Sequence, residues 1–282
     1  MKKFVLLQMI IALPYFSQAK NYFCQQDTLP ANDSAIDQTE CYEKFFQKCE
    51  PISAPGKTML ILKNKKTVSL NSFFKYSNAD TSMGIGTQQG LADLDNDGKK
   101  ELVLYDYTGG AHCCDEFYIF KNIAPNKYQY VAKTFAGDVC ITDKNEFIYD
   151  FYQQYGYFFT CFACAYADSS DAGPQPVHGI TLKYSKGKLV VVPGDKELKS
   201  TINDNLGKLR EQPYQKLQDE ADQDNGLRKE FALNLAVYYY SFGRNLAGTK
   251  QLFDKYYHFP DAKEVWTRFV QILNGIRKDS DF

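Results

Sequence analysis

An acidic loop that leads directly into an apolar run is the feature that most constrains how this chain folds. Asp93, Asp95 and Asp97 place carboxylates at alternate positions, and Gly98 permits a sharp bend after them. A loop of this kind can curl around calcium, which takes about six to eight oxygen ligands. In a helix–loop–helix calcium site the twelfth position carries an acid, whereas here it is Leu104, within an apolar run. The sequence therefore predicts a loop that joins two β-strands.

Two more residues complete the predicted site. Lys99 would contribute its backbone carbonyl oxygen and Glu101 its carboxylate. A turn without metal is the alternative, because Asp, Asn and Gly favour turns for their own reasons. Carboxylates crowded onto so few residues repel one another unless a cation neutralises them, which favours calcium. Magnesium is disfavoured because it keeps its waters. The predicted calcium ligands are Asp93, Asp95, Asp97, Lys99 and Glu101.

Short apolar runs between turn residues fill residues 57–195 and predict β-strands. The runs are rich in β-branched and aromatic residues, which suit strands better than helices. No long helical pattern separates them, so we expect antiparallel sheets, arranged as a sandwich or as a partial propeller. A turn at 185–187 links the last two runs. The predicted strands lie at 59–62, 102–105, 117–120, 128–131, 147–149, 180–184 and 189–192.

Residues 196–282 have helical spacing instead. An aromatic stripe predicts a helix that ends at Gly243, a residue suited to a helix C-terminus. Asp261, followed three residues later by Glu264, predicts the N-cap of another helix. Three helices are predicted, over 231–242, 245–257 and 261–276. The predicted fold class is therefore α+β: an antiparallel β-rich domain followed by a C-terminal α-helical domain.

The first nineteen residues have the pattern of a secretory signal peptide. Lys2 and Lys3 form a positive start, residues 4–16 are apolar, and Ser17 and Ala19 supply small residues before a cleavage site. A membrane anchor is disfavoured because a spanning helix needs about 20 apolar residues. We expect an exported protein, periplasmic or extracellular, without a transmembrane segment after cleavage. The expected segments are a signal peptide at 1–19, a cysteine-containing N-terminal segment at 20–56, the β-rich calcium-loop domain at 57–195 and the helical domain at 196–282.

The charge of the mature chain argues against nucleic acid as a partner. Removal of Lys2 and Lys3 would leave 31 Lys and Arg residues against 34 Asp and Glu residues, a formal charge of −3. So weak an imbalance gives no electrostatic reason to bind a polyanion.

All eight cysteines follow the expected cleavage site, and export favours disulfides over free thiols. Eight cysteines allow about 105 pairings, so the connectivity stays open. Adjacent Cys113 and Cys114 are too close to bond to each other without strain. On an extended strand, Cys161 and Cys164 would be roughly 10 Å apart, so we expect bonds between the two pairs. The disulfide candidates are Cys24, Cys41, Cys49, Cys113, Cys114, Cys140, Cys161 and Cys164.

Near the N-terminus, Cys41 and Cys49 flank a predicted short helix. A disulfide between them would close this helix, and a bond to Cys24 would tie it down instead. A small capping segment is the expected role of this region.

The acidic loop and the run that follows it are similar to the FG-GAP or VCBS-type repeats of integrin-like β-propellers. This resemblance implies that the calcium loop lies between two strands and that the five predicted ligands occupy the ligand positions of the repeat. The sequence Gly-Gly-Ala-His-Cys-Cys at 109–114 and Cys-Phe-Ala-Cys at 161–164 resemble a group of exported bacterial proteins of unknown function. The likeness covers residues 85–195 and contains one intact acidic loop, so we do not expect a complete ring of blades.

Two other chemistries compete with this interpretation. His112 and the neighbouring cysteines could form a zinc site, but adjacent strand residues point to opposite faces and export favours oxidation. Asp106 and Asp115 flank the loop at 109–112 and could be the paired carboxylates of a secreted hydrolase acting on cell-wall or glycan material. No serine lies in a Gly-x-Ser-x-Gly elbow.

We therefore expect a non-enzymatic, calcium-binding β-module that is adhesive or associated with the cell envelope. Its ligand would be an unknown protein or glycan, held by the loop after the calcium site. The binding-loop candidates are His112, Asp106 and Asp115.

Overall fold

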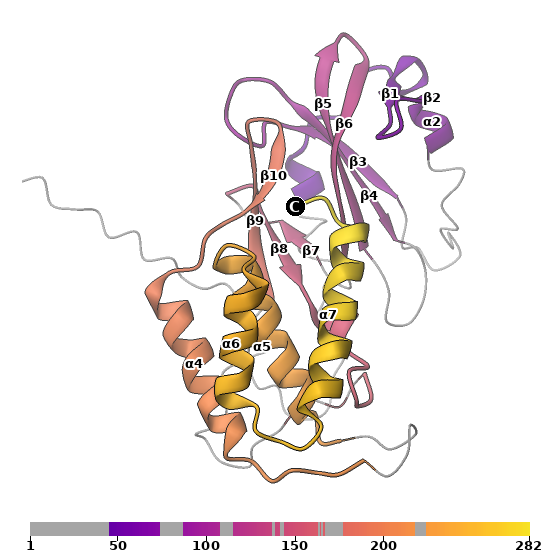
Figure 1. Cartoon of the computed structure of the whole chain (residues 1–282). Coiled ribbons are helices and arrows are strands. Elements are labelled where there is room, and N and C mark those ends of the chain that lie inside the picture. The colour runs from indigo at the N-terminus through magenta and orange to yellow at the C-terminus, as the bar shows by residue number, and fades with distance from the viewer. Residues whose placement is uncertain are drawn as a thin grey trace, which may run out of the picture. The chain divides into compact units, whose positions relative to one another are not determined.

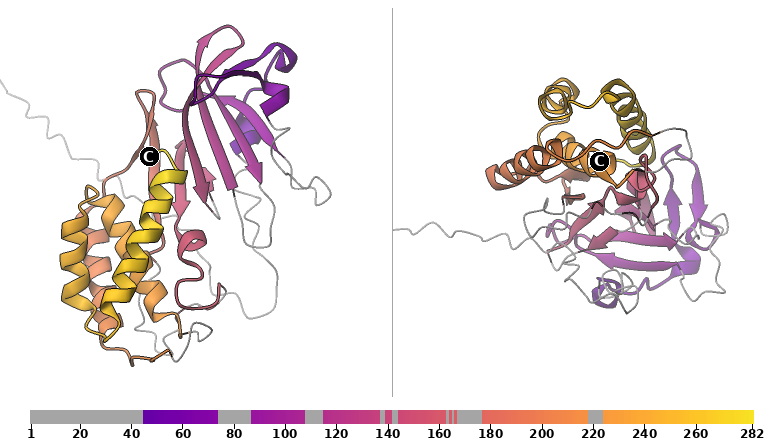
Figure 2. Two further views of the ribbon diagram at one scale, coloured as in Figure 1. Left: turned by 45° about the vertical axis from the view of Figure 1, so that its right-hand side comes forward. Right: turned by 90° about the horizontal axis from the view of Figure 1, so that it is seen from below.

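The computed structural model describes residues 45–73, 87–107, 115–136, 139–141, 144–162, 164, 166, 177–217 and 224–282 (Figure 1). The predicted α+β class is confirmed, since two mainly antiparallel sheets come first in the chain and the long helices follow (Figure 2). The predicted signal peptide and the loop at 109–114 lie outside the described residues.

Six strands form the first sheet, in the order β2–β1–β6–β5–β4–β3. They are β1 (Met59–Ile61), β2 (Thr67–Ser69), β3 (Gln88–Ala92), β4 (Glu101–Tyr107), β5 (Asp115–Ala124) and β6 (Lys127–Ala136). Neighbours are antiparallel except for β1 and β6, which run parallel where Met59 pairs with Lys127. This short parallel pair was not expected. No hairpin joins β1 to β6, so no turn dictates their relative direction.

Four antiparallel strands form the second sheet, in the order β10–β9–β8–β7. They are β7 (Val139–Ile141), β8 (Glu146–Asp150), β9 (Gly179–Ser185) and β10 (Lys188–Val191). Buried and less buried residues alternate along β8 and β9, as expected of strands that cover a core with one face. Lys186 and Gly187 both have positive φ, 51° and 73°, which matches the twist of a two-residue hairpin turn.

The helical part begins with a helix that the sequence did not reveal, α4 (Lys196–Arg210). The three predicted helices are present as α5 (Leu227–Ser241), α6 (Leu246–Tyr256) and α7 (Ala262–Asp279). Shorter elements are η1 (Pro55–Lys57), α2 (Leu70–Phe73) and α3 (Tyr152–Tyr155). Among the described residues, no helix combines the length and apolar character needed to cross a membrane.

Helix ends follow the predicted signals with one exception. Gly243, with φ of 89°, follows α5, and the Asn245 side chain accepts a hydrogen bond from Gly248 N at the start of α6. Asp261 precedes α7 as predicted, but its side chain does not cap the helix. Its carboxylate instead accepts hydrogen bonds from Arg228 Nε at 2.6 Å and Tyr257 Oη at 2.9 Å, because a buried guanidinium competes for it.

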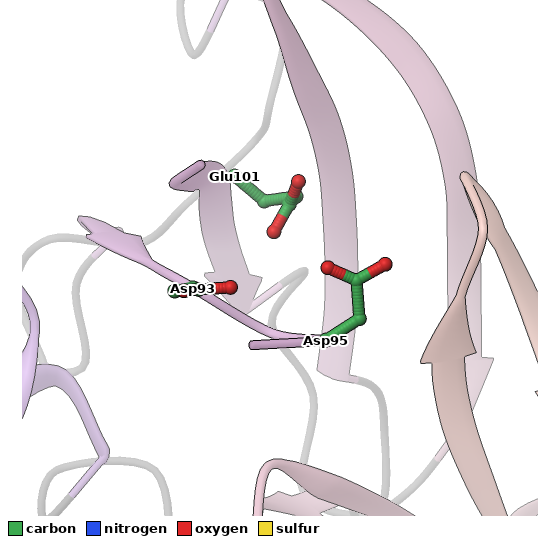
Figure 3. A group of neighbouring side chains, drawn as sticks. All are labelled: Asp93, Asp95 and Glu101. Atoms are coloured by element: carbon green, nitrogen blue, oxygen red, sulfur yellow. The ribbon is translucent and has the colours of Figure 1, made fainter. Parts of the chain in front are cut away.

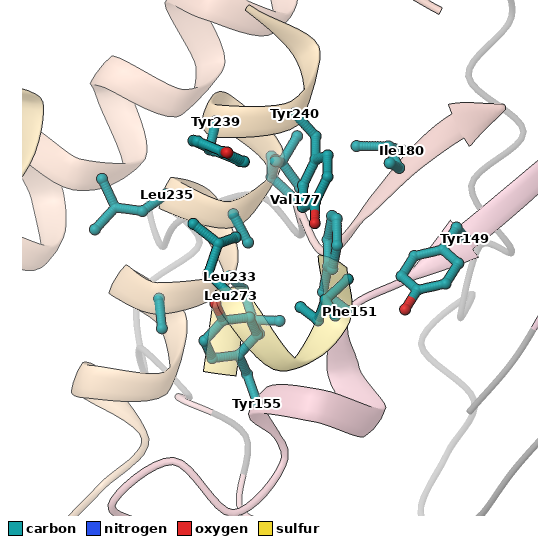
Figure 4. Close-up of a cluster of buried hydrophobic side chains, with 14 of the residues drawn as sticks. Tyr149, Phe151, Tyr155, Val177, Ile180, Leu233, Leu235, Tyr239, Tyr240 and Leu273 are labelled. Carbon is teal, nitrogen blue, oxygen red and sulfur yellow. The ribbon is translucent and has the colours of Figure 1, made fainter. Parts of the chain in front are cut away.

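A hydrophobic core joins both sheets to the helices. Figure 4 shows the part of it that lies between the second sheet and the helices. Tyr149 and Ile180 reach it from the second sheet, and Leu233 and Leu273 reach it from α5 and α7. The predicted boundary at residue 195 coincides with the change from strands to helices but does not divide this core. All described residues belong to a single compact unit that spans 37–282.

Helix α5 is buried along almost its whole length. It packs against α3, α4, α6, α7 and β9. As a consequence, three consecutive charged residues near its start, Arg228, Lys229 and Glu230, lie inside the protein at 1%, 1% and 7% exposure.

Candidate metal centre

The acidic loop connects β3 to β4, which pair in antiparallel register from Gln88–Tyr105 to Ala92–Glu101. The strand–loop–strand arrangement predicted from the sequence is therefore confirmed. Asn96 and Gly98 turn the chain with positive φ of 57° and 83°.

Three of the five predicted ligand residues converge. Asp93, Asp95 and Glu101 each place a carboxylate oxygen within 4.8 Å of the others (Figure 3). Asp97 is outside this group, because its Oδ1 accepts a hydrogen bond from Lys99 N at 2.8 Å and its Oδ2 lies 3.6 Å from Lys99 Nζ. The geometry thus centres the site on the first and second aspartates and on the acid that begins β4.

The Asp93 carboxylate shapes the loop. Its Oδ1 accepts a hydrogen bond from Asp97 N at 3.0 Å and its Oδ2 accepts one from Gly98 N at 2.9 Å. These bonds satisfy backbone donors that the turn would otherwise leave without partners. The same local bonding explains why the sequence pattern alone was enough to predict the loop.

Turns of the second sheet hold the loop from the opposite side. Asn145, just before β8, donates from Nδ2 to Asp93 O at 3.0 Å. Lys186, in the turn between β9 and β10, donates from its backbone N to Asp95 Oδ2 at 3.3 Å. The candidate site therefore lies where the two sheets meet, which the sequence did not indicate.

The electrostatics of the site show an excess of negative charge. Glu101 is 4% exposed, and its Oε2 accepts a hydrogen bond from Leu94 N at 3.1 Å. Burial raises the pKa of Glu101 to about 7, and the charges of Asp95 and Asp97 add to this effect. Burial, followed by the charges of Glu101 and Asp95, also raises the pKa of the nearby Tyr184 hydroxyl.

These residues fit a hard divalent cation. All the converging ligand atoms are oxygens, the type that calcium prefers. Asp95 Oδ1 is buried, and within the described part of the chain it has no hydrogen-bond partner. Within the same residues, no lysine or arginine forms an ion pair with Asp93, Asp95 or Glu101. A bound cation would satisfy the buried oxygen and neutralise the cluster.

The cysteine prediction was wrong for one pair. Cys161 and Cys164 are bonded to each other, with 5.0 Å between their Cα atoms. The segment is not the extended strand that the sequence suggested: Phe159 has φ of 57°, and Cys164 N donates to Cys161 O at 3.2 Å, as in a turn. The turn brings the cysteines within bonding range. Their bond also removes both thiolates from the rival zinc site.

Cys49 is a free thiol, in contrast to its predicted disulfide. It lies at the end of the helical turn that begins at residue 45, and its Sγ contacts Phe45 O at 3.4 Å. Its Cβ occupies the space that a side chain at Gly90 would need, only 2.3 Å from the ideal Cβ position. Burial raises the pKa of the thiol to about 11. Of the other candidates, Cys24, Cys41, Cys113 and Cys114 lie outside the described residues, as does the side chain of Cys140.

The backbone register places an acid other than the predicted Asp115 opposite Asp106, and the side chain of Asp115 lies outside the described residues. In the β4–β5 ladder Asp106 pairs with Glu116, whereas Asp115 pairs with Tyr107. Residues directly opposite each other share a face, so Glu116 is the acid beside Asp106. Glu116 also accepts a hydrogen bond from the Tyr118 hydroxyl and forms an ion pair with Lys133. The sequence could not reveal this, because the strand register depends on the loop that joins β4 to β5. His112 lies outside the described residues.

The helical part carries surface depressions. Two open ones, of about 550 and 650 Å³, lie on the helical part, and neither is lined by Asp106 or Glu116.

Sequence reasoning missed a second polar cluster at the start of α5. His178 Nε2 lies 3.1 Å from Glu230 Oε1. Burial acts to lower the pKa of His178, but the hydrogen bond to Glu230 and the charges of Glu230 and Asp150 outweigh it, so the pKa is raised. Lys229 lies next to this pair. The only sign of this cluster in the sequence is the run of charged residues at the start of an otherwise apolar helix. Such a run is also typical of a helix face exposed to solvent, so it did not indicate a buried cluster.

A comparison with family models, with curated proteins and with solved structures found no match to this chain.

Proposed function

We propose that the loop at residues 93–101 binds calcium and that the protein is an exported, non-enzymatic β-module that binds a protein or glycan ligand. The observation that carries the calcium proposal is the convergence of Asp93, Asp95 and Glu101 within 4.8 Å around a buried oxygen of Asp95 without a partner among the described residues. Calcium bound there would stabilise the fold without taking part in a reaction.

The position of the loop supports a structural role for the ion. The loop contacts the turn before β8 and the turn between β9 and β10. Neutralising the three acids would remove their mutual repulsion at the point where the two sheets meet. Calcium would thus strengthen the contact between the sheets and hold β4 in place.

Export is the part of the proposal that rests on the signal-peptide pattern, and the disulfide between Cys161 and Cys164 is compatible with it. The proposed likeness to FG-GAP or VCBS-type repeats rests on the loop sequence. We prefer a binding role to a hydrolytic one because the acid opposite Asp106 in the strand register is Glu116, which contacts Tyr118 and Lys133, and not the predicted Asp115.

A calcium titration tests the calcium site. The melting temperature of the wild-type protein should rise with calcium, and calcium at about 100 times its dissociation constant should add about 2.7 kcal/mol to the free energy of unfolding. Asp95→Asn keeps the side-chain shape but removes a charge from the cluster, so this variant should lose most of the calcium response. Calorimetric titration would measure the affinity directly.

Asp254→Asn is a matched control, because Asp254 is an exposed acid on α6 that pairs with Lys250. This variant should respond to calcium like the wild type. An equal response of the wild-type and Asp95→Asn proteins would rule out the site at this loop.

A further inference from the structure

The side chain of Lys229 is buried in a pocket of oxygen atoms. It is 1% exposed, yet Nζ donates hydrogen bonds to Gly156 O at 3.2 Å, Cys161 O at 3.1 Å and Phe162 O at 3.0 Å. Tyr152 Oη is a fourth acceptor at 3.1 Å, so the three N–H groups of the ammonium are shared among four oxygens, and Nζ lies 4.6 Å from the centre of the Tyr152 ring. Four oxygens and an aromatic face therefore replace the water that an ammonium group needs.

The ammonium is charged under ordinary conditions. Burial lowers the pKa of Lys229 to about 8, although the charges of Glu230 and Asp224 act in the opposite direction. At neutral pH the buried group is therefore still protonated. Removing even two of its acceptors would leave part of a buried charge unsolvated, which is costly.

The oxygens around Lys229 are held in two different ways. The residues next to Cys161 on the N-terminal side are fixed from outside: Phe159 O accepts from Asp224 N at 3.0 Å, and the Thr160 hydroxyl donates to Asp224 O at 2.9 Å. Gly156 O belongs to an earlier part of the chain, directly after α3. The other two carbonyls belong to Cys161 and Phe162, inside the turn that the disulfide to Cys164 closes, and Phe162 O also accepts a hydrogen bond from Tyr152 Oη at 3.1 Å.

We infer that the Cys161–Cys164 disulfide is a redox-sensitive cross-link. It holds two carbonyl oxygens against the Lys229 ammonium and thereby fixes this turn to helix α5. Reduction by a dithiol breaks the S–S bond and forms two cysteine thiols. The dithiol supplies two electrons and two protons and is itself oxidised to a disulfide. The turn is then free to open, which loosens the contact of Cys161 O and Phe162 O with Lys229, whereas Gly156 O and Tyr152 Oη lie outside the turn and stay in place. This role is independent of calcium, because none of these residues belongs to the acidic loop.

Hydrogen exchange on the wild-type protein provides a test that needs no mutation. The amide of Cys164, which donates to Cys161 O, should exchange about tenfold faster or more in the presence of a dithiol. Amides in the centre of β5 and β6 should change little. Equal exchange of the Cys164 amide in the two states would overturn the proposal.

A double-mutant cycle tests the link to Lys229. Cys161→Ser/Cys164→Ser should increase the unfolding equilibrium constant at pH 7 by about tenfold more in a Lys229 background than in Lys229→Met, which has no ammonium to desolvate. Lys278→Met, at an exposed position on α7, should leave the effect of opening the disulfide as large as in the wild type. The same fold-change in the Lys229 and Met backgrounds would show that the disulfide acts without the ammonium and would overturn the inference.

Discussion

The acidic loop between β3 and β4 and the start of helix α5 both bury charged side chains, but they balance the charge in different ways. At the start of α5, Arg228 donates to Asp224 Oδ2 at 2.9 Å and to Asp261 Oδ2 at 2.6 Å, and Lys229 is surrounded by oxygens. At the loop, three acids converge, and the described residues supply no cationic side chain to them.

The charges of the α5 cluster are compensated by other protein side chains, whereas those of the acidic loop need a cation from the solution. The α5 cluster carries its own cations, so its stability should be indifferent to dissolved metal ions. The loop has negative charge in excess and a buried oxygen of Asp95 without a partner among the described residues, so its stability should depend on an added cation. Variants of the two regions should therefore differ in their response to calcium.

The largest effect is expected from Arg228→Met. The side chains of Arg228 and Asp224 are 1% and 0% exposed, and Asp261 is 14% exposed. Methionine would fill much of the space but leave two carboxylates without their partner, which should lower the free energy of unfolding by about 3–5 kcal/mol. Urea denaturation with and without calcium would measure it, and the loss should be the same in both conditions.

Arg210→Met is the matched control for this variant. Arg210 pairs with Glu211 at the surface, with both side chains well exposed, so the change should cost less than about 1 kcal/mol. A loss of similar size for Arg210→Met and Arg228→Met would contradict the view that burial makes the α5 ion pairs important.

The two regions also differ in how far the sequence could predict them. The loop depends on residues within nine positions of one another, and its first aspartate bonds to the backbone of the same turn. A local pattern was therefore sufficient to locate it. The α5 cluster joins Lys229 to Tyr152 and Cys161, and Arg228 to Asp261, across 33 to 77 positions. No local pattern identifies such partners.

The errors made from the sequence have the same origin. Cys161 and Cys164 were expected to be too far apart because an aromatic-rich run was taken as a strand, whereas a turn follows Phe159. Asp106 and Asp115 were considered as paired carboxylates, but the register of β4 and β5 places Glu116 opposite Asp106. Asp261 was expected to cap α7, but Arg228, on another helix, binds its carboxylate. In each case a tertiary contact or a register overrode a local preference.

Glu101→Gln should have effects of opposite sign with and without calcium. In the presence of a chelator at pH 8, where most of the Glu101 carboxyl is ionised because its pKa is about 7, the variant removes one of three repelling charges from a buried position, so the free energy of unfolding should rise by about 1–2 kcal/mol. With calcium in excess the variant lacks a charged ligand and should be less stable than the wild type. Denaturation curves in chelator and in calcium would measure both differences.

The matched control is Glu230→Gln in the α5 cluster, where Glu230 is bonded to His178. This change removes a favourable partner, so it should lower stability equally with chelator and with calcium. If Glu101→Gln also lowered stability in chelator, the acids of the loop would not be in net repulsion and the comparison would fail.

The smallest effect concerns proton binding by Lys229. Because the pKa of Lys229 is lowered to about 8 in the folded protein, the unfolded chain binds more protons than the folded protein between about pH 8 and the ordinary lysine range. Stability from this group should therefore rise with pH in that window. Relative to Lys229→Met, the wild type should gain about 1 kcal/mol between pH 7 and pH 9, measured by urea denaturation. The groups that face Lys229 are Glu230, Asp224, Tyr152 and His178, and all are retained in the variant.

Lys278→Met controls for the general effect of removing a lysine, because the ammonium at this exposed position is in water in the folded and unfolded chain alike. The difference in the free energy of unfolding between Lys278→Met and the wild type should be constant from pH 7 to pH 9. The result for Lys229 decides what the oxygen pocket does. A gain means that burial dominates and that the four oxygens only partly replace water. If the free energy of unfolding of the wild type relative to Lys229→Met were constant or fell with pH, these oxygens would solvate the ammonium as well as water does. The buried charges of the α5 cluster would then be fully compensated by their protein partners.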